Sequence, residues 1–340
     1  MGISRRDVLA GAGAIAATAA TGSAMAQSFA FKPNQRYPDP ALEILDPSFL
    51  KYRIYSSTVE QIASGMRWAE GPAYFPAGRS LVWSDNPNNR MLRYDECDGS
   101  VSVFRQPSNY SNGNTVDRAG RLVSCEHGAR RVSRTEFDGT VTTIADRYNG
   151  KRLNSPNDVI VKSDGGIWFS DPTYGIDSDY EGHKSDSEQD GSHVYRVDPK
   201  SGEVAKMTDD FVKPNGLAFS PDEKLLYIVD TGRTHVENGP AHIRRFKVGE
   251  NDRLSGGEVF AECTNGLFDG FRLDTEGRIW TSAADGVHCY HPDGTLIGKI
   301  HVPEVVANVC FGGDKRNYLY ICGTTSLYGV RLPINGAKTF

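Results

Sequence analysis

A short β-strand pattern recurs six times along the chain, and this repeat constrains the fold most strongly. Each copy is a run rich in β-branched and aromatic residues, and the six runs align on Trp83, Val123, Trp168, Tyr227, Trp280 and Tyr320. Successive anchors are 40, 45, 59, 53 and 40 residues apart, close to the roughly 40–50 residues of a four-stranded propeller blade. A β-sandwich of unrelated strands does not predict such a repeat. We therefore expect an all-β fold, a six-bladed β-propeller.

The boundaries of the predicted propeller follow from the same repeat. Hairpin turns such as Asp98-Gly99 and Asp293-Gly294 follow the anchors and join the outer strands of a blade. Residues 51–63 are strand-like but precede the first full repeat, so we expect them to close the ring against the last blade. The propeller is thus assigned to residues 51–340, and residues 27–50 are assigned to an N-terminal extension.

The first 26 residues are typical of an export signal. Ser-Arg-Arg-Asp-Val-Leu at residues 4–9 is a twin-arginine signature, and Ala-Met-Ala at residues 24–26 is a small-x-small cleavage site. The Ala/Gly-rich run between them is too short to span a bilayer. We expect a twin-arginine signal peptide, cleavage after Ala26, transport by the twin-arginine export machinery, and a periplasmic or secreted mature protein that is not in the membrane.

Charge and cysteine usage limit the partners of the mature protein. The formal net charge is −5 and no stretch concentrates Lys and Arg, so no nucleic acid partner is expected. The six cysteines are dispersed without zinc spacing. Twin-arginine substrates fold in a reducing cytosol, so we expect buried free thiols. Because a propeller closes its own edges, we expect a monomer or a weak dimer.

A polar residue, usually followed by Gly, stands 11 to 13 residues before every anchor. These residues are Glu70, Asn112, Asn157, Asn215, Asp269 and Asn308. In a propeller this position begins the innermost strand, so the six side chains should converge on the central channel. Carboxylate and carboxamide oxygens are ligands for a hard cation such as Ca²⁺ or Mg²⁺. A single cation seldom takes more than four side chains, so some of the six are expected only to line the channel.

The motifs around these residues resemble the gluconolactonase/regucalcin (senescence marker protein) family. They are Trp-Ala-Glu-Gly-Pro at 68–72, Ser-Pro-Asn-Asp at 155–158, Pro-Asn-Gly-Leu-Ala-Phe-Ser-Pro-Asp at 214–222, Asp-Gly-Phe-Arg-Leu-Asp at 269–274 and Cys-Phe-Gly-Gly at 310–313. The similarity covers about residues 55–335, and residues 120–128 look more like the bacterial exported gluconolactonase branch than the animal one. It implies a six-bladed propeller with a divalent metal in its channel and hydrolysis of sugar lactones.

The resemblance also implies roles for individual residues. Glu70, Asn215 and Asp269 take the places of the family's metal-binding Glu, Asn and Asp, and Asn157 that of an Asn contacting metal or substrate. The implied ligands of one divalent cation are therefore Glu70, Asn157, Asn215 and Asp269. Ca²⁺ is the favoured ion, with Mg²⁺, Mn²⁺ and Zn²⁺ as alternatives.

A divalent cation held by these four residues suggests a mechanism. A metal-bound lactone carbonyl is polarised, and a neighbouring carboxylate can deprotonate the attacking water. Asp269 is the candidate base, and its direct attack as a nucleophile is left open. The candidate substrate-binding residues are Asn112, His127, Asn157 and Tyr174. An acidic insertion at residues 175–192 follows Tyr174, and we leave open whether it is a lid or a solvated loop.

The sequence therefore predicts a periplasmic, metal-dependent lactonase that opens a gluconolactone-like sugar lactone to the aldonic acid. No Gly-x-Ser-x-Gly elbow, His-Glu-x-x-His motif or P-loop is present, which disfavours a serine hydrolase, a zinc protease and an NTPase. Three alternatives remain. They are a phosphotriester or organofluorophosphate hydrolase of the same fold, a non-catalytic calcium- or sugar-binding propeller, and a scaffold whose channel residues bind only water.

Overall fold

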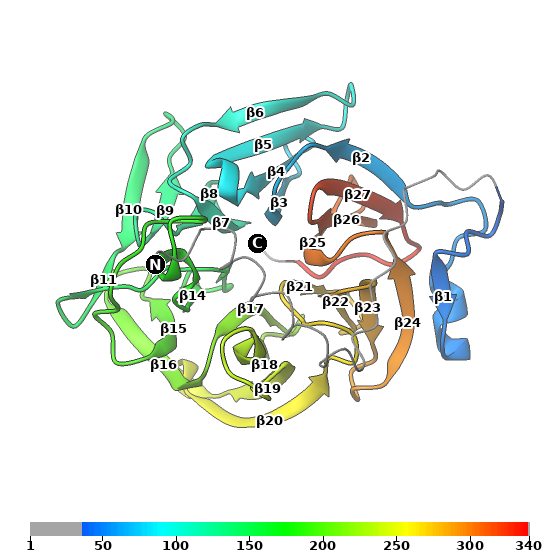
Figure 1. Cartoon of the computed structure of the whole chain (residues 1–340). Helices are drawn as coiled ribbons and strands as arrows, with labels where there is room; N and C mark the ends of the chain where they lie inside the picture. Colours follow the sequence, from blue (N-terminus) through cyan, green and yellow to red (C-terminus); the bar gives the residue numbers. More distant parts are fainter. Residues whose placement is uncertain (1–35, 339–340) are drawn as a thin grey trace, which may run out of the picture.

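Six antiparallel sheets are arranged as blades around a central channel (Figure 1). The structure is a computed structural model that describes residues 36–338. Blade 1 contains, from the channel outwards, β3 (Ala69–Phe75), β4 (Ser80–Asp85), β5 (Arg90–Asp95) and β6 (Val101–Arg105). Blade 2 contains β7 (Ser111–Val116), β8 (Leu122–Glu126), β9 (Arg131–Thr135) and β10 (Val141–Ala145). Blade 3 contains β13 (Val159–Val161), β14 (Ile167–Asp171), β15 (Ser192–Val197) and β16 (Val204–Phe211).

The second half of the ring has the same construction. Blade 4 contains β17 (Pro214–Phe219), β18 (Leu225–Asp230), β19 (His242–Val248) and β20 (Leu254–Glu262). Blade 5 contains β21 (Phe271–Leu273), β22 (Ile279–Ala283), β23 (Gly286–Tyr290) and β24 (Leu296–His301). Blade 6 contains β25 (Val306–Gly312), β26 (Tyr318–Gly323), β27 (Ser326–Arg331) and, from the start of the chain, β2 (Glu60–Ser64). The innermost strands contact each other all the way round, β25 against β3 included, and this confirms the predicted six-bladed propeller.

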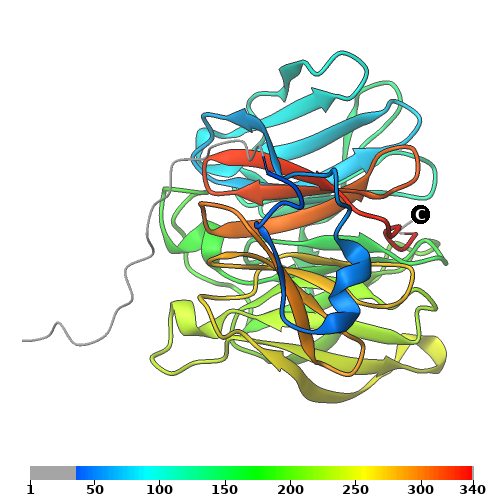
Figure 2. The same cartoon turned by 90° about the vertical axis from the view of Figure 1, so that its right-hand side faces the viewer.

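Ring closure uses the N-terminal strand as the sequence predicts. β2 runs antiparallel to β27, with Glu60 opposite Gly329 and Ser64 opposite Ser326. An additional strand was not foreseen: β1 (Leu42–Ile44) pairs with β24 as a fifth strand of blade 5. The 3₁₀ helix η1 (Pro47–Tyr52) then packs on the flank of this blade (Figure 2). Part of the segment assigned to an extension is therefore integral to a blade.

Shorter elements connect or extend the blades. They are the hairpin of β11 (Arg147–Tyr148) and β12 (Lys151–Arg152), the 3₁₀ helices η2 (Asn86–Asn88), η3 (Gly232–Thr234) and η4 (Glu250–Asp252), and the helix α1 (Tyr174–Asp177). No helix among residues 36–338 is long and apolar enough to cross a membrane. The predicted signal peptide, residues 1–26, lies outside the described residues.

The six anchors form the core of the second strand in each blade. Trp83, Trp168 and Trp280 are 0% exposed, and burial of a large apolar side chain stabilises a fold by roughly 1.5–3 kcal/mol. The Trp280 ring also contacts Phe49 and Tyr52 of η1, at centroid distances of 5.9 and 6.0 Å. These contacts explain why the N-terminal segment docks on blade 5 in particular.

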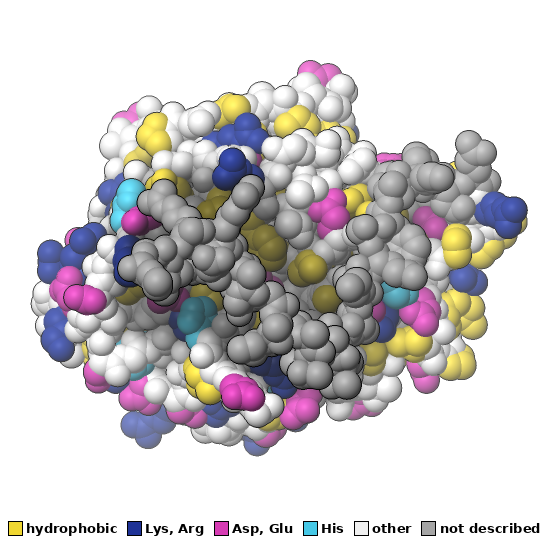
Figure 3. All heavy atoms as spheres, in the orientation of Figure 1, with side chains coloured by type: hydrophobic (Ala, Val, Ile, Leu, Met, Phe, Trp, Pro, Cys, Tyr) yellow, Lys and Arg dark blue, Asp and Glu magenta, His cyan; other side chains and the backbone are white. Residues whose placement is uncertain are grey.

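The cysteines and the surface charges complete the description. All six cysteines are free thiols, and five are buried as predicted, but Cys97 is exposed. On the face seen in Figure 3, Lys and Arg side chains lie interspersed with Asp and Glu rather than gathered together.

Candidate active site

The six predicted polar residues all lie at the beginning of an innermost strand. Four of them lie within β3, β7, β17 and β25, whereas Asn157 and Asp269 lie two residues before β13 and β21. In blades 1, 2, 4 and 6, the pairing of the innermost strand shifts register at or beside the polar residue, as between Glu70 and Ala73. Such a bulge redirects a side chain, so the sheet itself turns these residues towards the channel.

Glycines after the polar residues allow the innermost strands to approach each other closely. A Cβ at Gly71 would overlap the carbonyl oxygen of Asn112, and a Cβ at Gly216 would overlap that of Asp269. Only glycine fits such an approach of two backbones. The sequence pattern of a polar residue followed by Gly therefore has a packing cause, which brings neighbouring polar residues to one level of the channel.

A cavity of about 420 Å³ opens at this end of the channel. Five of the six predicted residues line it, namely Glu70, Asn112, Asn157, Asn215 and Asp269. The sixth, Asn308, is buried beside them, and its Nδ2 donates to Glu70 Oε2 at 3.0 Å. Trp68, Leu267 and Val305 contribute apolar wall. The cavity thus combines a polar floor with apolar walls, as small-molecule sites do.

The carboxylates of Glu70 and Asp269 lie together at the floor of the cavity and favour the binding of a positive charge. Burial raises the pKa of Glu70 to about 8, with repulsion from Asp158 as the next cause. Burial also raises the pKa of Asp269 well above its usual range, and Glu70 and Asp158 add to this shift. Among cations in the described region, Arg272 is near, with Nη1 3.8 Å from Asp158 Oδ2. A cation between Glu70 and Asp269 would relieve this repulsion.

The donor atoms fit a hard cation. Among residues 36–338, no group of three or more His, Cys, Asp or Glu side chains could hold a metal ion. The oxygen donors at the floor that could hold a cation are the carboxylates of Glu70 and Asp269 and the amide oxygens of Asn157 and Asn215. Carboxylate and carbonyl oxygens form the ligand set of Ca²⁺ or Mg²⁺, whereas structural zinc sites use Cys and His, and catalytic zinc sites combine His or Cys with Asp or Glu.

His127 lies behind Asn112 and not in the cavity. Its ring is fully buried, and burial lowers the pKa of this imidazole to about 4, so the ring is neutral at pH 7. Nδ1 lies 3.2 Å from the backbone oxygen of Glu181, which can only accept, so Nδ1 donates and Nε2 is left as an acceptor. His127 is therefore not among the residues that line the cavity, contrary to the prediction of a substrate-contacting residue, and it contacts the lining residue Asn112 instead.

The same tautomer determines how Asn112 points. Asn112 Nδ2 donates to His127 Nε2 at 3.1 Å, which leaves Asn112 Oδ1 free. That oxygen is buried without a hydrogen-bond partner among the described residues. A buried acceptor is costly when unpaired, so Asn112 Oδ1 is suited to a hydroxyl or cation that enters the cavity.

Tyr174 lines the cavity from the start of α1, as predicted for a substrate-contacting residue. Its hydroxyl is held by Thr231 Oγ1 at 2.7 Å and Thr234 Oγ1 at 2.8 Å. The following insertion adds Tyr180 and Glu181 to the lining, two residues that the sequence analysis did not identify. The insertion lies outside the blade repeat, so the spacing that located the other residues gave no signal for these.

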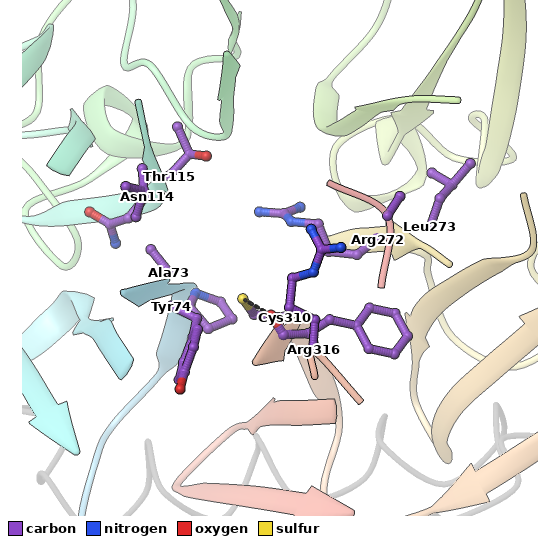
Figure 4. Close-up of a pocket in the computed structure, with 12 residues that line it drawn as sticks. Ala73, Tyr74, Asn114, Thr115, Arg272, Leu273, Cys310 and Arg316 are labelled. Atoms are coloured by element: carbon purple, nitrogen blue, oxygen red, sulfur yellow. Dashed lines mark hydrogen bonds between the residues drawn. The ribbon is translucent and has the colours of Figure 1, made fainter. Parts of the chain in front are cut away.

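The innermost strands also border a second pocket, farther along the channel. It measures about 40 Å³, and its lining includes residues two to four positions after the six polar residues in the sequence, such as Asn114 and Cys310. Figure 4 shows Arg272 and Arg316 pointing into it. Its positive charge and small size suit neither a cation nor a sugar lactone, so the larger cavity is the candidate active site.

Comparison with known proteins places the chain in a family. The model of the SMP-30/gluconolactonase/LRE-like region matches residues 68–325. The chain belongs to this family. The resemblance seen in the sequence motifs is thereby confirmed.

Several named lactonases align over most of the chain. The gluconolactonase of Zymomonas mobilis is 31% identical over 309 residues, which cover 84% of this chain and 83% of that protein. The pentonolactonase of Haloferax volcanii is 30% identical over 270 residues, 76% of this chain and 82% of that protein. The structure of a gluconolactonase from Xanthomonas campestris superposes with a TM-score of 0.80 at 38% identity, covering 86% of this chain and 94% of that one.

Proposed function

We propose that this protein is a periplasmic or secreted hydrolase of sugar lactones that depends on a divalent cation, with Ca²⁺ as the favoured ion. Lactone hydrolysis itself is supported by the named relatives, which include a gluconolactonase and a pentonolactonase of matching length. The observation that carries the metal dependence is the convergence of Glu70, Asp269, Asn157 and Asn215 on one cavity floor. Gluconolactone is the expected type of substrate, and the open aldonic acid is the product.

Four residues would hold the cation. Glu70 and Asp269 supply its charge balance, and Asn157 and Asn215 supply neutral oxygens. When bound, a divalent cation polarises a carbonyl and stabilises negative charge on its oxygen. Glu70 is held in place for this role, because its Oε2 accepts from Asn308 Nδ2 and from the backbone N of Gly71.

The two carboxylates differ in access to the substrate. Glu70 is 4% exposed, whereas Asp269 is only half-buried, so Asp269 is the carboxylate that a water molecule in the cavity can reach. Asp269 accepts a proton from this water as the water oxygen bonds to the lactone carbonyl carbon. The bond from that carbon to the ring oxygen then breaks, and the ring oxygen takes the proton to become the hydroxyl of the acid.

The remaining lining residues orient the lactone and exclude water. Asn112 Oδ1, unpaired in the described structure, accepts from a substrate hydroxyl. Trp68 and Tyr174 present ring surface to the apolar face of a sugar. Apolar walls lower the local dielectric, which strengthens electrostatic interactions at the floor.

The test is lactone hydrolysis by the mature protein from residue 27, followed by proton release. Metal-free protein should be inactive on glucono-1,5-lactone, and Ca²⁺ should restore activity. Asp269→Asn should lower kcat by at least 100-fold, since removal of a general base typically costs 10²–10⁴-fold. Activity that persists in a chelator, or an Asp269→Asn variant as active as the parent, would overturn the proposal. Diisopropyl fluorophosphate is run alongside, and turnover of this compound alone would select the phosphotriesterase alternative.

A further inference from the structure

The insertion after Tyr174 carries a third carboxylate to the cavity. Glu181 lines the cavity, and its backbone oxygen accepts from His127 Nδ1 at 3.2 Å. Two hydrogen bonds fold the insertion back onto α1: the backbone N of His183 donates to the Gly175 carbonyl, and that of Ser185 donates to the Ile176 carbonyl, both at 3.0 Å. Glu181 therefore has a defined place in the wall.

The rest of the insertion is anchored to blade 2 and to the hairpin of β11 and β12. Arg130 Nη1 donates to Ser185 Oγ at 3.0 Å, and the backbone N of Arg152 donates to Glu188 Oε2 at 2.8 Å. At Gly182 a Cβ would overlap the carbonyl of Gly175. These contacts on both sides of Glu181 hold this part of the insertion against the fold, while most other side chains of the insertion are exposed.

The charges that face the cavity all have the same sign. Glu70, Asp269 and Glu181 line it, and no Lys, Arg or His is among the described lining residues. Lys213, which lies behind Tyr174, is already paired with other groups. Its Nζ lies 3.0 Å from Asp177 Oδ2 and 4.8 Å from the centre of the Tyr174 ring. A divalent cation at the floor offsets two carboxylates. Burial and repulsion from Asp177 raise the pKa of Glu181 to about 7, so above this pH Glu181 adds an excess of negative charge to the cavity.

We propose that this site takes uncharged lactones and that Glu181 makes it reject lactones with an additional carboxylate, phosphate or sulfonate group. This inference rests on the proposed lactone hydrolysis. A lactone whose carbonyl lies at the floor has its far substituents against the walls, where Glu181, Tyr180 and Val305 lie and where no described cation can pair with an anion. Like charges in a partly desolvated cavity repel over several ångströms.

The test compares two lactones that differ in one group. D-glucono-1,4-lactone ends in a hydroxymethyl group, and D-glucaro-1,4-lactone carries a carboxylate at that position. At pH 8, above the pKa of about 7 to which burial raises Glu181, we expect kcat/KM to be at least ten-fold higher for the uncharged lactone. Glu181→Gln should reduce this ratio about ten-fold by improving use of the anionic lactone. The matched control is Asp186→Asn, which removes a charge from an exposed position of the same insertion outside the cavity and should leave the ratio unchanged.

Failure of this inference is distinguishable from failure of the proposed function. Equal kcat/KM for the two lactones, or an unchanged ratio in Glu181→Gln, would overturn the charge selection while hydrolysis stands. If neither lactone is hydrolysed, calorimetric binding of gluconolactam and its 6-carboxylate counterpart to the Ca²⁺-loaded protein decides the matter. Preferential binding of the neutral lactam would support the inference, and equal or tighter binding of the anionic one would contradict it.

Discussion

The cation-free protein should lose stability as the pH rises, because Glu70 and Asp269 are both buried carboxyl groups with raised pKa values. Burial raises the pKa of Glu70 from 4.5 to about 8. Between these values the folded protein holds a proton that the unfolded chain has released, so the free energy of unfolding falls as pH increases. At 1.36 kcal/mol per unit, the three units between pH 5 and pH 8 amount to about 4 kcal/mol.

Thermal unfolding of metal-free protein at pH 5, 6, 7, 8 and 9 measures this effect. For the roughly 300 structured residues, about 2.1 cal/mol/K of unfolding entropy per residue converts 4 kcal/mol into a decrease in Tm of ~6 °C. Glu70→Gln is the control, because it is uncharged at every pH and retains an oxygen that can accept from Asn308. The prediction concerns the difference between the two proteins, in which titration of groups away from the floor, such as His127 and Asp171, cancels. Asp269 adds to the difference in the same direction, because Glu70 raises its pKa.

Cation binding should abolish the difference, because it holds Glu70 ionised at every pH tested. Saturating Ca²⁺ should therefore flatten the dependence of the parent Tm on pH and leave Glu70→Gln nearly unaffected. Parallel Tm profiles of parent and Glu70→Gln without metal would refute the account of the floor as a buried, uncompensated carboxylate pair.

Three further predictions follow from the packing, the polar network and the leader. Gly216→Ala places a Cβ on the carbonyl oxygen of Asp269, so it should destabilise the fold by about 1–3 kcal/mol, as overpacking does, and lower kcat. A melting curve and a rate that match the parent would contradict the close approach of the two backbones. His127→Phe removes the acceptor that orients Asn112, so KM should rise several-fold more than kcat falls. In the pH–rate profile of the parent, no kinetic pKa from His127 should appear between pH 5 and 8. An unchanged KM in the variant would show that Asn112 does not need His127 to orient it. Replacing both arginines of residues 4–9 by lysine should leave uncleaved precursor in the cytoplasm, as measured by fractionation and immunoblotting, and an unaltered distribution would exclude twin-arginine export.

The repeat in the sequence was sufficient to predict the fold because propeller blades are built from local hairpins. Anchors such as Trp83 and Trp280 mark the second strand of each blade, and the ring then follows from their number. The short strand β1 and helix η1 were missed because their positions depend on long-range contacts. Leu42–Ile44 is only three residues long, and its register is set by β24 and by packing of Phe49 against Trp280.

The polar floor was predictable for the same reason, since Glu70 and Asp269 recur in phase with the blades. The repeat could not predict which side chains line the cavity and which lie behind it, nor the position of residues in insertions. His127 and Asn308 lie one layer behind the cavity, which is a matter of side-chain packing. Glu181 lies in an insertion without a repeat partner, so only the folded chain shows that it lines the cavity.

The most direct test of the central claim is a titration of metal-free mature protein with Ca²⁺, with the initial rate of glucono-1,5-lactone hydrolysis as the readout. The account predicts a rate near zero without metal, a rise that saturates at one Ca²⁺ per chain, and no rise in a Glu70→Gln, Asp269→Asn double variant. Full activity in the metal-free protein, or activation that the double variant retains, would contradict it.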